Sequence, residues 1–446
     1  MLSAFANSFK IPELRQRILF TLGLIFICRL IANVPTPGVD ASALQRVIQE
    51  LQQTSGGSFF GLYNLFSGGA LQRCAVGTLG IMPYISASII FQLLTAVVPQ
   101  LERLAREGEV GRQKITQYTR YATVGLCLFQ GGLMARTLLN PQAIGISRQI
   151  VSASFSPVGF ILLTMVTMTT ATMLLMWLGE QITERGIGNG ISLIITVNIV
   201  SRLPQAIYAL GNKFQTGEYG FFHLVFFAAM MVAVIAGVVA VTQAQRKIPV
   251  QYAKRVVGRK MYGGQNTYMP LRVNYAGVLP IIFAQAILMF PAKILQWAPG
   301  EWTNRLAAAI SFGTVPYMVL FGLMILFFSY FWVATQFNPV QIADDLKKYG
   351  GYVPGIRPGK PTAEYLDNAM SRITLAGALF LTVIAVLPTV MAIQFRIPFV
   401  ISSFFGGTSL LIMVGVMLDT MRQVESHLLM RHYDGFLKKG KLRSRR

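Results

Sequence analysis

The amino-acid sequence predicts an all-α polytopic membrane protein with ten transmembrane helices. Hydrophobic residues make up 53% of the 446 residues and charged residues only 13%, too few polar side chains to cover a water-soluble globule of this size. Apolar runs of roughly 20 residues, the length that crosses a bilayer, recur along the chain. The formal net charge of +22 gathers between these runs. Lipid is therefore expected to be much of the solvent around the chain.

Ten apolar runs are candidate spans. Because lipid offers the backbone no hydrogen-bond partner, each run is expected to form a helix. The spans are expected at about residues 18–34, 74–98, 118–138, 157–178, 187–206, 221–242, 273–291, 314–335, 373–393 and 402–421.

The distribution of Lys and Arg predicts the orientation of these spans. Lys10, Arg15 and Arg17 precede the first span, and most other basic residues lie in the loops after even-numbered spans and in the C-terminal tail. Positive charge near the ends of spans marks the cytosolic side. A smaller set lies on the other side and includes Arg46, Arg148, Lys213 and Arg305. Both termini are therefore expected in the cytosol.

Five spans in each half would invert the second half relative to the first, as in transporters built from inverted repeats. We expect an N-terminal half at residues 1–206, a C-terminal half at 207–421 and a basic cytosolic tail at 422–446. The repeat is inferred from span number and topology, because the two halves share no clear sequence identity.

Metal and cofactor chemistry is not indicated. The cysteines have no CxxC spacing and the histidines are scattered, so neither a zinc site nor an HExxH protease is predicted. These residues are Cys28, Cys74, Cys127, His223, His427 and His432. We expect no metal, no cofactor and no catalytic residue.

Two other function classes were weighed against the residues. An ion-coupled secondary transporter needs ionisable groups at mid-membrane, and the spans are nearly free of them. Arg29 and Asp419 lie toward span ends, and Glu180 and Glu184 are expected in a short cytosolic turn. An intramembrane serine protease would rest on the weak pair Ser192 and His223.

Three segments interrupt the simple pattern of spans. Residues 56–72 are apolar and aromatic but too short to cross a bilayer, which fits either a re-entrant element or an interfacial helix. Residues 243–272 contain seven basic and no acidic residues, with interleaved tyrosines. Such a loop fits topology and anionic lipid as well as RNA or a protein partner. Residues 336–371 hold Arg357 in a proline-rich turn, which fits a docking contact, although the residues alone favour helix capping or completion of the cytosolic charge.

Paired isoleucines recur at helical spacing in two spans. Ile81 and Ile85 share one face of the second span, and Ile187 and Ile191 repeat the spacing. Such a pair usually packs or faces lipid.

Four motifs together resemble the SecY family, whose members form the channel of the bacterial Sec translocon. They are GIMPYISAS at 80–88, GEQITERGIGNGIS at 179–192, VPGIRPG at 353–359 and FGGTSLLI at 405–412. The resemblance implies a non-enzymatic, protein-conducting channel that passes unfolded secretory polypeptides and releases apolar segments sideways into the bilayer. It also implies a central hourglass pore between the halves.

The resemblance implies a role for four groups of residues. An apolar pore ring would comprise Ile81, Ile85, Ile187, Ile191, Ile282 and Ile412. A plug at about 56–72 would include Phe59, Phe60, Leu62, Tyr63, Leu65 and Phe66, with Arg73 at its base. A lateral gate, between spans two with three and seven with eight, would include Ser86, Gln92, Gln130 and Asn274. Docking loops 243–272 and 336–371 would present Lys254, Arg255, Arg259, Lys260, Arg357, Pro358 and Gly359.

The same resemblance implies the partners and the location. The expected partners are SecE-like and SecG-like small membrane subunits, the SecA ATPase motor, the ribosome, anionic lipids, and secretory and membrane protein precursors as substrates. The expected location is the plasma (inner) membrane of a bacterium.

Overall fold

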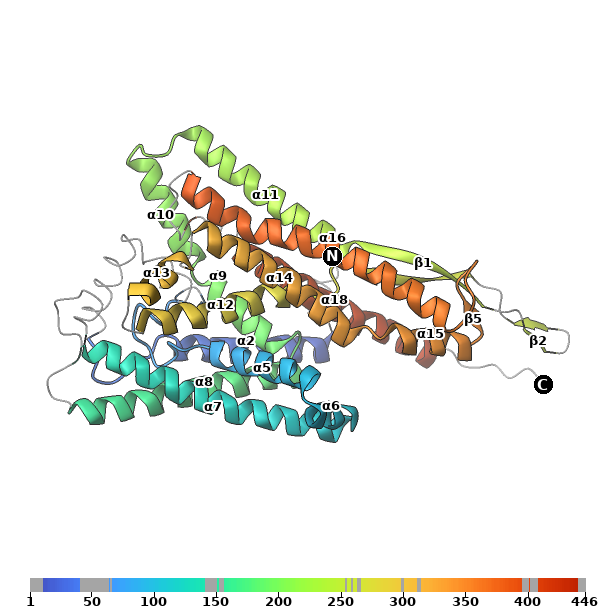
Figure 1. Cartoon of the computed structure of the whole chain (residues 1–446), viewed down its shortest axis with the longest axis horizontal. Coiled ribbons are helices and arrows are strands. Elements are labelled where there is room, and N and C mark those ends of the chain that lie inside the picture. The colour runs from blue at the N-terminus through green and yellow to red at the C-terminus, as the bar shows by residue number, and fades with distance from the viewer. Residues whose placement is uncertain are drawn as a thin grey trace. The chain divides into compact units, whose positions relative to one another are not determined.

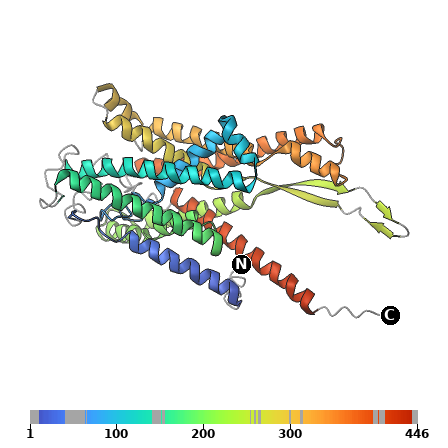
Figure 2. The same ribbon diagram turned by 90° about the horizontal axis from the view of Figure 1, so that it is seen from below.

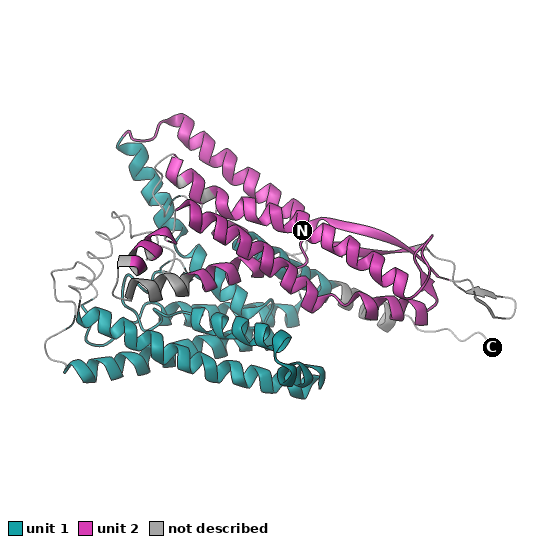
Figure 3. Ribbon diagram, viewed as in Figure 1, with its two compact units in different colours: residues 1–216, 399–401, 412–446 teal, residues 217–398, 402–411 magenta. Residues whose placement is uncertain are grey.

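The computed structural model forms two compact units, which Figure 3 colours separately. Unit 1 comprises residues 1–216, 399–401 and 412–446, and unit 2 comprises 217–398 and 402–411. The structure describes residues 11–40, 64, 66–140, 151, 156–252, 255–257, 260–262, 266–297, 301–310, 314–394, 401 and 408–439. The halves predicted from the sequence, 1–206 and 207–421, describe an inverted repeat and not compact units. Their boundaries remain a prediction.

Unit 1 is a bundle of helices (Figure 1). Its helices are α2 (Pro12–Ile31), α5 (Met82–Val97), α6 (Pro99–Arg106), α7 (Glu109–Leu139), α8 (Pro157–Arg185), α9 (Gly190–Val200), α10 (Leu203–Gln215) and most of α18 (Thr408–Lys439). Helix α7 packs against α5 and α8, and α8 also packs against α2 and α9. Several of these helices begin with proline, whose missing N–H is unneeded in the first turn. Ser156 and Asn189 cap α8 and α9 through their side-chain oxygens.

Unit 2 contains a second helical bundle and the strands. Its helices are α11 (Phe221–Gln243), α12 (Leu279–Trp297), α13 (Glu301–Ala309), α14 (Val315–Gln336), α15 (Pro339–Lys348) and α16 (Lys360–Gln394). Helix α14 packs against α12 and α16, and α15 packs against α16. Thr314 and Asn338 cap α14 and α15.

The strands of unit 2 build a long antiparallel hairpin (Figure 2). They are β1 (Gln245–Tyr252), β2 (Arg255–Val257), β3 (Lys260–Tyr262), β4 (Asn266–Arg272) and β5 (Gly351–Tyr352), with sheet order β4-β1-β5 and a separate β2-β3 pair. Strand β1 runs in register with β4 from Gln245–Arg272 to Gln251–Asn266. Of the seven basic residues of 243–272, Arg246, Lys247 and Arg272 therefore lie in strands β1 and β4, and Arg255 and Lys260 lie in the β2–β3 pair.

An apolar cluster anchors this hairpin to the helices of unit 2. Ile248 of β1 and Leu271 of β4 are buried with Val333 and Phe337 at the end of α14, and with Leu366 near the start of α16. The alternate residues Lys247 and Pro249 are exposed. This inside–outside alternation is the period of a strand with one buried face.

The helical membrane fold predicted from the sequence is confirmed. Six of the described helices are long and apolar enough to cross a membrane, and a seventh span results if the bent pair α5–α6 is counted as one. The all-α prediction omitted the strands. The alternation of polar and apolar residues in RKIPVQY predicts a strand, but the expectation for this segment rests on its charge alone.

The predicted span at 74–98 is wrong in its first third. Residues 74–81 form turns, and helix α5 begins only at Met82. Cys74 and Gly80 have φ values of +43° and +57°, which a right-handed helix excludes. At its other end, α5 meets α6 at a bend of 98°.

Two further boundaries differ from the expectation. Glu180 and Glu184 lie in α8, which continues to Arg185, and not in a cytosolic turn. The predicted span at 187–206 corresponds to α9 and α10, which are separated by a turn at residues 201–202 and together, as Gly190–Gln215, are long and apolar enough to cross a membrane. Polar residues that follow an apolar run are expected to form a loop, but a helix can continue beyond the bilayer.

The close contact between α8 and α9 predicts a site that tolerates no side chain. A Cβ on Gly190 would overlap the carbonyl oxygen of Gly179 and lie 2.8 Å from Ile182 Cβ. We expect Gly190→Ala to destabilise the fold by about 1–3 kcal/mol, the usual cost of overpacking. The measurement is thermal unfolding of the detergent-purified protein.

Gly211→Ala in α10 is the matched control, because a Cβ there meets nothing within 4 Å. Equal melting temperatures for the two variants would contradict the packing described.

Candidate functional site

Residues 64 and 66, which are helical, and the turns at residues 67–73 belong to unit 1. We call residues 64 and 66–73 the plug base, after the part of the expected plug that they include. Gly68 and Gly69 have φ values of +66° and +90°, conformations that favour glycine. Phe66 is buried and Arg73 is exposed. The other expected plug residues lie outside the described residues: Phe59, Phe60, Leu62, Tyr63 and Leu65.

The chain after the plug base is joined to the end of α2. Thr36 N–H donates to the Cys74 carbonyl at 2.8 Å, and Val76 N–H donates to the Val34 carbonyl at 2.8 Å. Pro35 and Ala75 form an antiparallel bridge between these two bonds. The plug base is therefore held at a fixed position relative to the end of α2.

Three polar side chains donate hydrogen bonds to the plug base. Both terminal nitrogens of Arg29 donate to the Gly68 carbonyl, at 3.3 and 3.2 Å. Asn198 Nδ2 donates to the Phe66 carbonyl at 2.9 Å, and its Oδ1 accepts from Arg29 Nη1 at 3.2 Å.

Arg202, in the turn between α9 and α10, supplies the remaining contact: its Nη1 donates to Gln72 Oε1 at 3.0 Å. Sequence reasoning missed Asn198 and Arg202. Their signal was present, because both are strongly polar residues inside the apolar run 187–206.

The six ring isoleucines are all among the described residues. Ile81 is the N-cap of α5, and Ile85 is buried one turn later. Ile191, in the first turn of α9, faces Gly179 of α8, since a Cβ on that glycine would lie 3.4 Å from Ile191 Cγ1. Ile412 in α18 is buried in unit 1, and Ile282 in α12 belongs to unit 2. That the six form one ring stays a prediction.

Ile187 has a further set of neighbours. It is buried in a cluster with Leu14 of α2 and Val424 of α18. Its N–H donates to Thr21 Oγ1 at 3.1 Å, and the next N–H, that of Gly188, donates to Gln423 Oε1 at 2.8 Å. The non-helical turn before α9 is therefore held by side chains from two other helices.

The helices of the expected gate pack in the predicted pairs, α5 with α7 and α12 with α14. Ser86 donates to the Met82 carbonyl of its own helix at 3.0 Å. Gln92 Oε1 is buried and accepts no hydrogen bond from the described residues. Gln130 is partly buried in α7, and Asn274 is buried in the turn before α12. Their gate role stays a prediction.

The structure brings the two expected docking loops together within unit 2. Strand β5, from the second loop, pairs with β1 of the first, and Tyr352 OH donates to Gln251 Oε1 at 3.1 Å. Arg357 and Pro358 are exposed and Gly359 is partly buried. Thr362 Oγ1 donates to the Arg357 carbonyl at 2.8 Å, which fixes this turn.

Two of the remaining docking residues lie in the β2–β3 pair. Arg255 pairs with Tyr262, and Lys260 pairs with Val257 across the β2–β3 turn. Lys254 and Arg259 lie outside the described residues.

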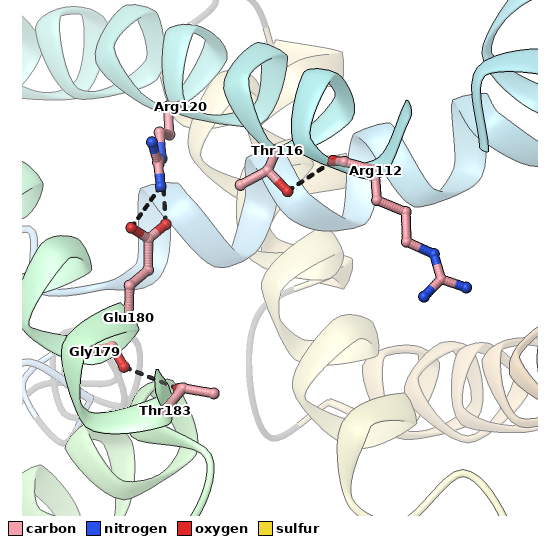
Figure 4. Close-up of polar contacts among 6 residues, drawn as sticks. All are labelled: Arg112, Thr116, Arg120, Gly179, Glu180 and Thr183. Carbon is pink, nitrogen blue, oxygen red and sulfur yellow. Dashed lines mark hydrogen bonds and ion pairs between the residues drawn. The ribbon is translucent and has the colours of Figure 1, made fainter. Parts of the chain in front are cut away.

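An ion pair that sequence reasoning missed joins α7 to α8. Arg120 Nη2 lies 2.7 Å from Glu180 Oε2 and Nε lies 3.3 Å from Oε1, so the pair is bidentate (Figure 4). The Glu180 side chain is 18% exposed. One turn on, Thr183 Oγ1 donates to the Gly179 carbonyl at 2.9 Å and accepts from Gly190 N–H at 2.9 Å. Polar contacts thus tie α7, α8 and α9 together.

Within the described part of the chain, no group of three His, Cys, Asp or Glu side chains is placed to hold a metal ion. The expectation of a site without metal or cofactor stays a prediction.

Comparison with known proteins identifies the family. The SecY family model matches residues 75–421. The protein translocase subunit SecY of Streptomyces galbus is 47% identical over 446 residues, covering 98% of this chain and 100% of that one. The chain belongs to the SecY family. The SecY subunit of Thermus thermophilus is likewise 47% identical, over the whole of both chains.

Solved structures of the SecY/Sec61 channels have the same fold. One, described as a protein-conducting channel, is 17% identical with a TM-score of 0.64 and covers 93% of this chain and 92% of that one. Sec61 from a canine ribosome–channel complex has a TM-score of 0.59 at 16% identity, with the same coverage. The predicted fold class, ten transmembrane helices in two halves, is confirmed by this similarity. The chain is a multi-pass membrane protein of a family that occurs in bacteria.

The ion pair between α7 and α8 provides a test of the packing in unit 1. We expect a coupling energy of about 1 kcal/mol between Arg120→Gln and Glu180→Gln, because Arg120 is 45% exposed and solvent screens the pair. The measurement is a double-mutant cycle on thermal unfolding in detergent.

The control is the exposed pair Arg106–Glu102 in α6, whose side chains are 78% and 49% exposed. We expect almost no coupling there. A coupling at Arg120–Glu180 no larger than in this control would contradict the contact described.

Proposed function

We propose that the chain is the protein-conducting channel of a bacterial Sec translocon. It passes unfolded secretory polypeptides across the membrane and releases apolar segments sideways into the bilayer. It performs no catalysis itself, and a partner supplies the energy.

The observation that carries this proposal is the extent of the family match. The matched residues 75–421 contain every expected ring isoleucine and both docking loops. The relatives that match along their whole length are described as protein translocase subunits. A transporter or protease that shared only the architecture would not account for this agreement.

The ring is proposed as the constriction of the pore. Branched apolar side chains exclude water and ions by dewetting, yet they can move apart around a polypeptide of any sequence. The burial of Ile81, Ile85 and Ile412 supports a closed, apolar resting state. The plug, above the ring on the outer side, provides the second barrier.

The lateral gate is proposed between the pairs α5 with α7 and α12 with α14. Each pair packs firmly within its own unit, so the pairs can separate as rigid elements. Gln92, whose side-chain oxygen is buried without a partner among the described residues, is available to an incoming chain.

The docking surface is proposed on the cytosolic side, together with both termini. Strand pairing between β1 and β5 makes one surface of the two loops, with Arg357 exposed on it. A fixed, exposed arginine suits RNA phosphate or a carboxylate of a partner. The proposed partners are SecA and the ribosome, with SecE-like and SecG-like subunits and anionic lipids around the channel in the plasma membrane.

The experiment that tests the function is reconstitution. Proteoliposomes containing the chain and its small subunits receive SecA, ATP and a secretory precursor, and protease-protected precursor is measured. Protected product that depends on the chain is expected. Equal protection in liposomes that lack the chain would contradict the proposal.

The docking surface makes a separate prediction. Arg255→Glu and Arg357→Glu should each reduce precursor transport at least about tenfold, because a reversed charge repels the acidic or phosphate group it would bind. Membrane insertion of the variants should stay normal. The measurement is transport in the reconstituted system beside the amount of chain in the membrane.

The control is Arg136→Glu, an exposed arginine in the last turn of α7 with the same change of charge. It should transport normally. Normal transport by both docking variants would count against the surface.

A further inference from the structure

The contacts on the plug base have a specific chemical character. Asn64 and Phe66 are helical and residues 67–73 form turns, so the Phe66 and Gly68 carbonyl oxygens lack the partners that a continuing helix would provide. Asn198 and Arg29 supply the missing donors. An unpaired buried carbonyl is costly, so these bonds favour the seated position of the segment.

Asn198 is the centre of this group. It is 6% exposed, and its amide uses the nitrogen for the Phe66 carbonyl and the oxygen for Arg29. One side chain of α9 therefore connects the plug base to α2.

Gly68 is required for this approach. Its φ is +66°, and a Cβ there would overlap Arg29 Nη1 and lie 2.7 Å from Asn198 Oδ1. A side chain at this position would displace both donors and strain the backbone.

Like charges oppose the seated state. Arg29, Arg73 and Arg202 lie close enough to interact with one another electrostatically, and all three are positive. The plug base is thus held by hydrogen bonds to neutral groups against mutual repulsion of the cations.

We propose that Arg29, Asn198 and Arg202 form a latch that positions the plug base in the resting channel. The latch acts through Phe66, Gly68 and Gln72. This inference rests on the proposed channel function and assigns positioning residues within it.

The test is the ion conductance of the purified channel complex in planar bilayers without precursor. Asn198→Leu and Gly68→Ala should raise the resting open fraction about tenfold, the change expected for loss of one buried hydrogen bond. The matched controls should behave as wild type. They are Asn212→Leu, an exposed asparagine in α10, and Gly23→Ala in α2, where a Cβ meets nothing within 4 Å.

A second variant acts in the opposite direction, so that misfolding cannot imitate the result. Gln72→Glu converts the bond with Arg202 into a charge-assisted pair and should lower the resting open fraction below that of wild type. The reduction should disappear in an Arg202→Gln background. A retained reduction there would contradict the latch.

Precursor transport by each variant is measured in parallel. Wild-type transport with unchanged resting conductance in Asn198→Leu and Gly68→Ala would overturn the latch and leave the channel function intact. Failure of the wild-type chain to transport precursor would overturn the channel function itself.

Discussion

Every peptide group that enters hydrocarbon must find its hydrogen-bond partner within the protein. Helices meet this requirement internally, and most of the described chain is helical. Two segments of unit 1, the plug base and the turn before α9, do not. Their backbone groups bond to Arg29, Asn198, Thr21 and Gln423, side chains that project from three different helices.

This constraint connects the architecture to the proposed function. A channel needs segments that move. A segment can move in a membrane only if its backbone groups exchange one set of hydrogen-bond partners for another. The donors around the plug base are long, polar and attached to separate helices, so helix movement breaks several bonds together. The apolar ring needs no such exchange, because isoleucine side chains move apart without leaving a polar group unpaired. In this proposal, polar positioning and apolar sealing are carried out by different residues.

The sequence predicted the spans well because hydrophobicity and length are enough to identify a helix in lipid. It did not predict that residues 74–81 form turns, since those residues are as apolar as the helix after them and the conformation depends on contacts with residues 34–36. The ring, plug and docking residues came from the resemblance to a family, not from periodicity. Asn198 and Glu180 were missed because their importance depends on partners far away in the sequence, Phe66 and Arg120. The hairpin was not predicted, because the expectation for this segment rested on its charge and not on its alternation of polar and apolar residues.

The central claim is that a polypeptide passes through the apolar ring, and the most direct measurement is crosslinking of a precursor stalled in transit. A photoreactive residue at Ile85, which is 6% exposed in the structure, should crosslink to the stalled chain. The same probe at Leu323 of α14, which is 57% exposed, should crosslink to lipid and not to the precursor. Crosslinks to the precursor from Leu323 and none from Ile85 would contradict the account.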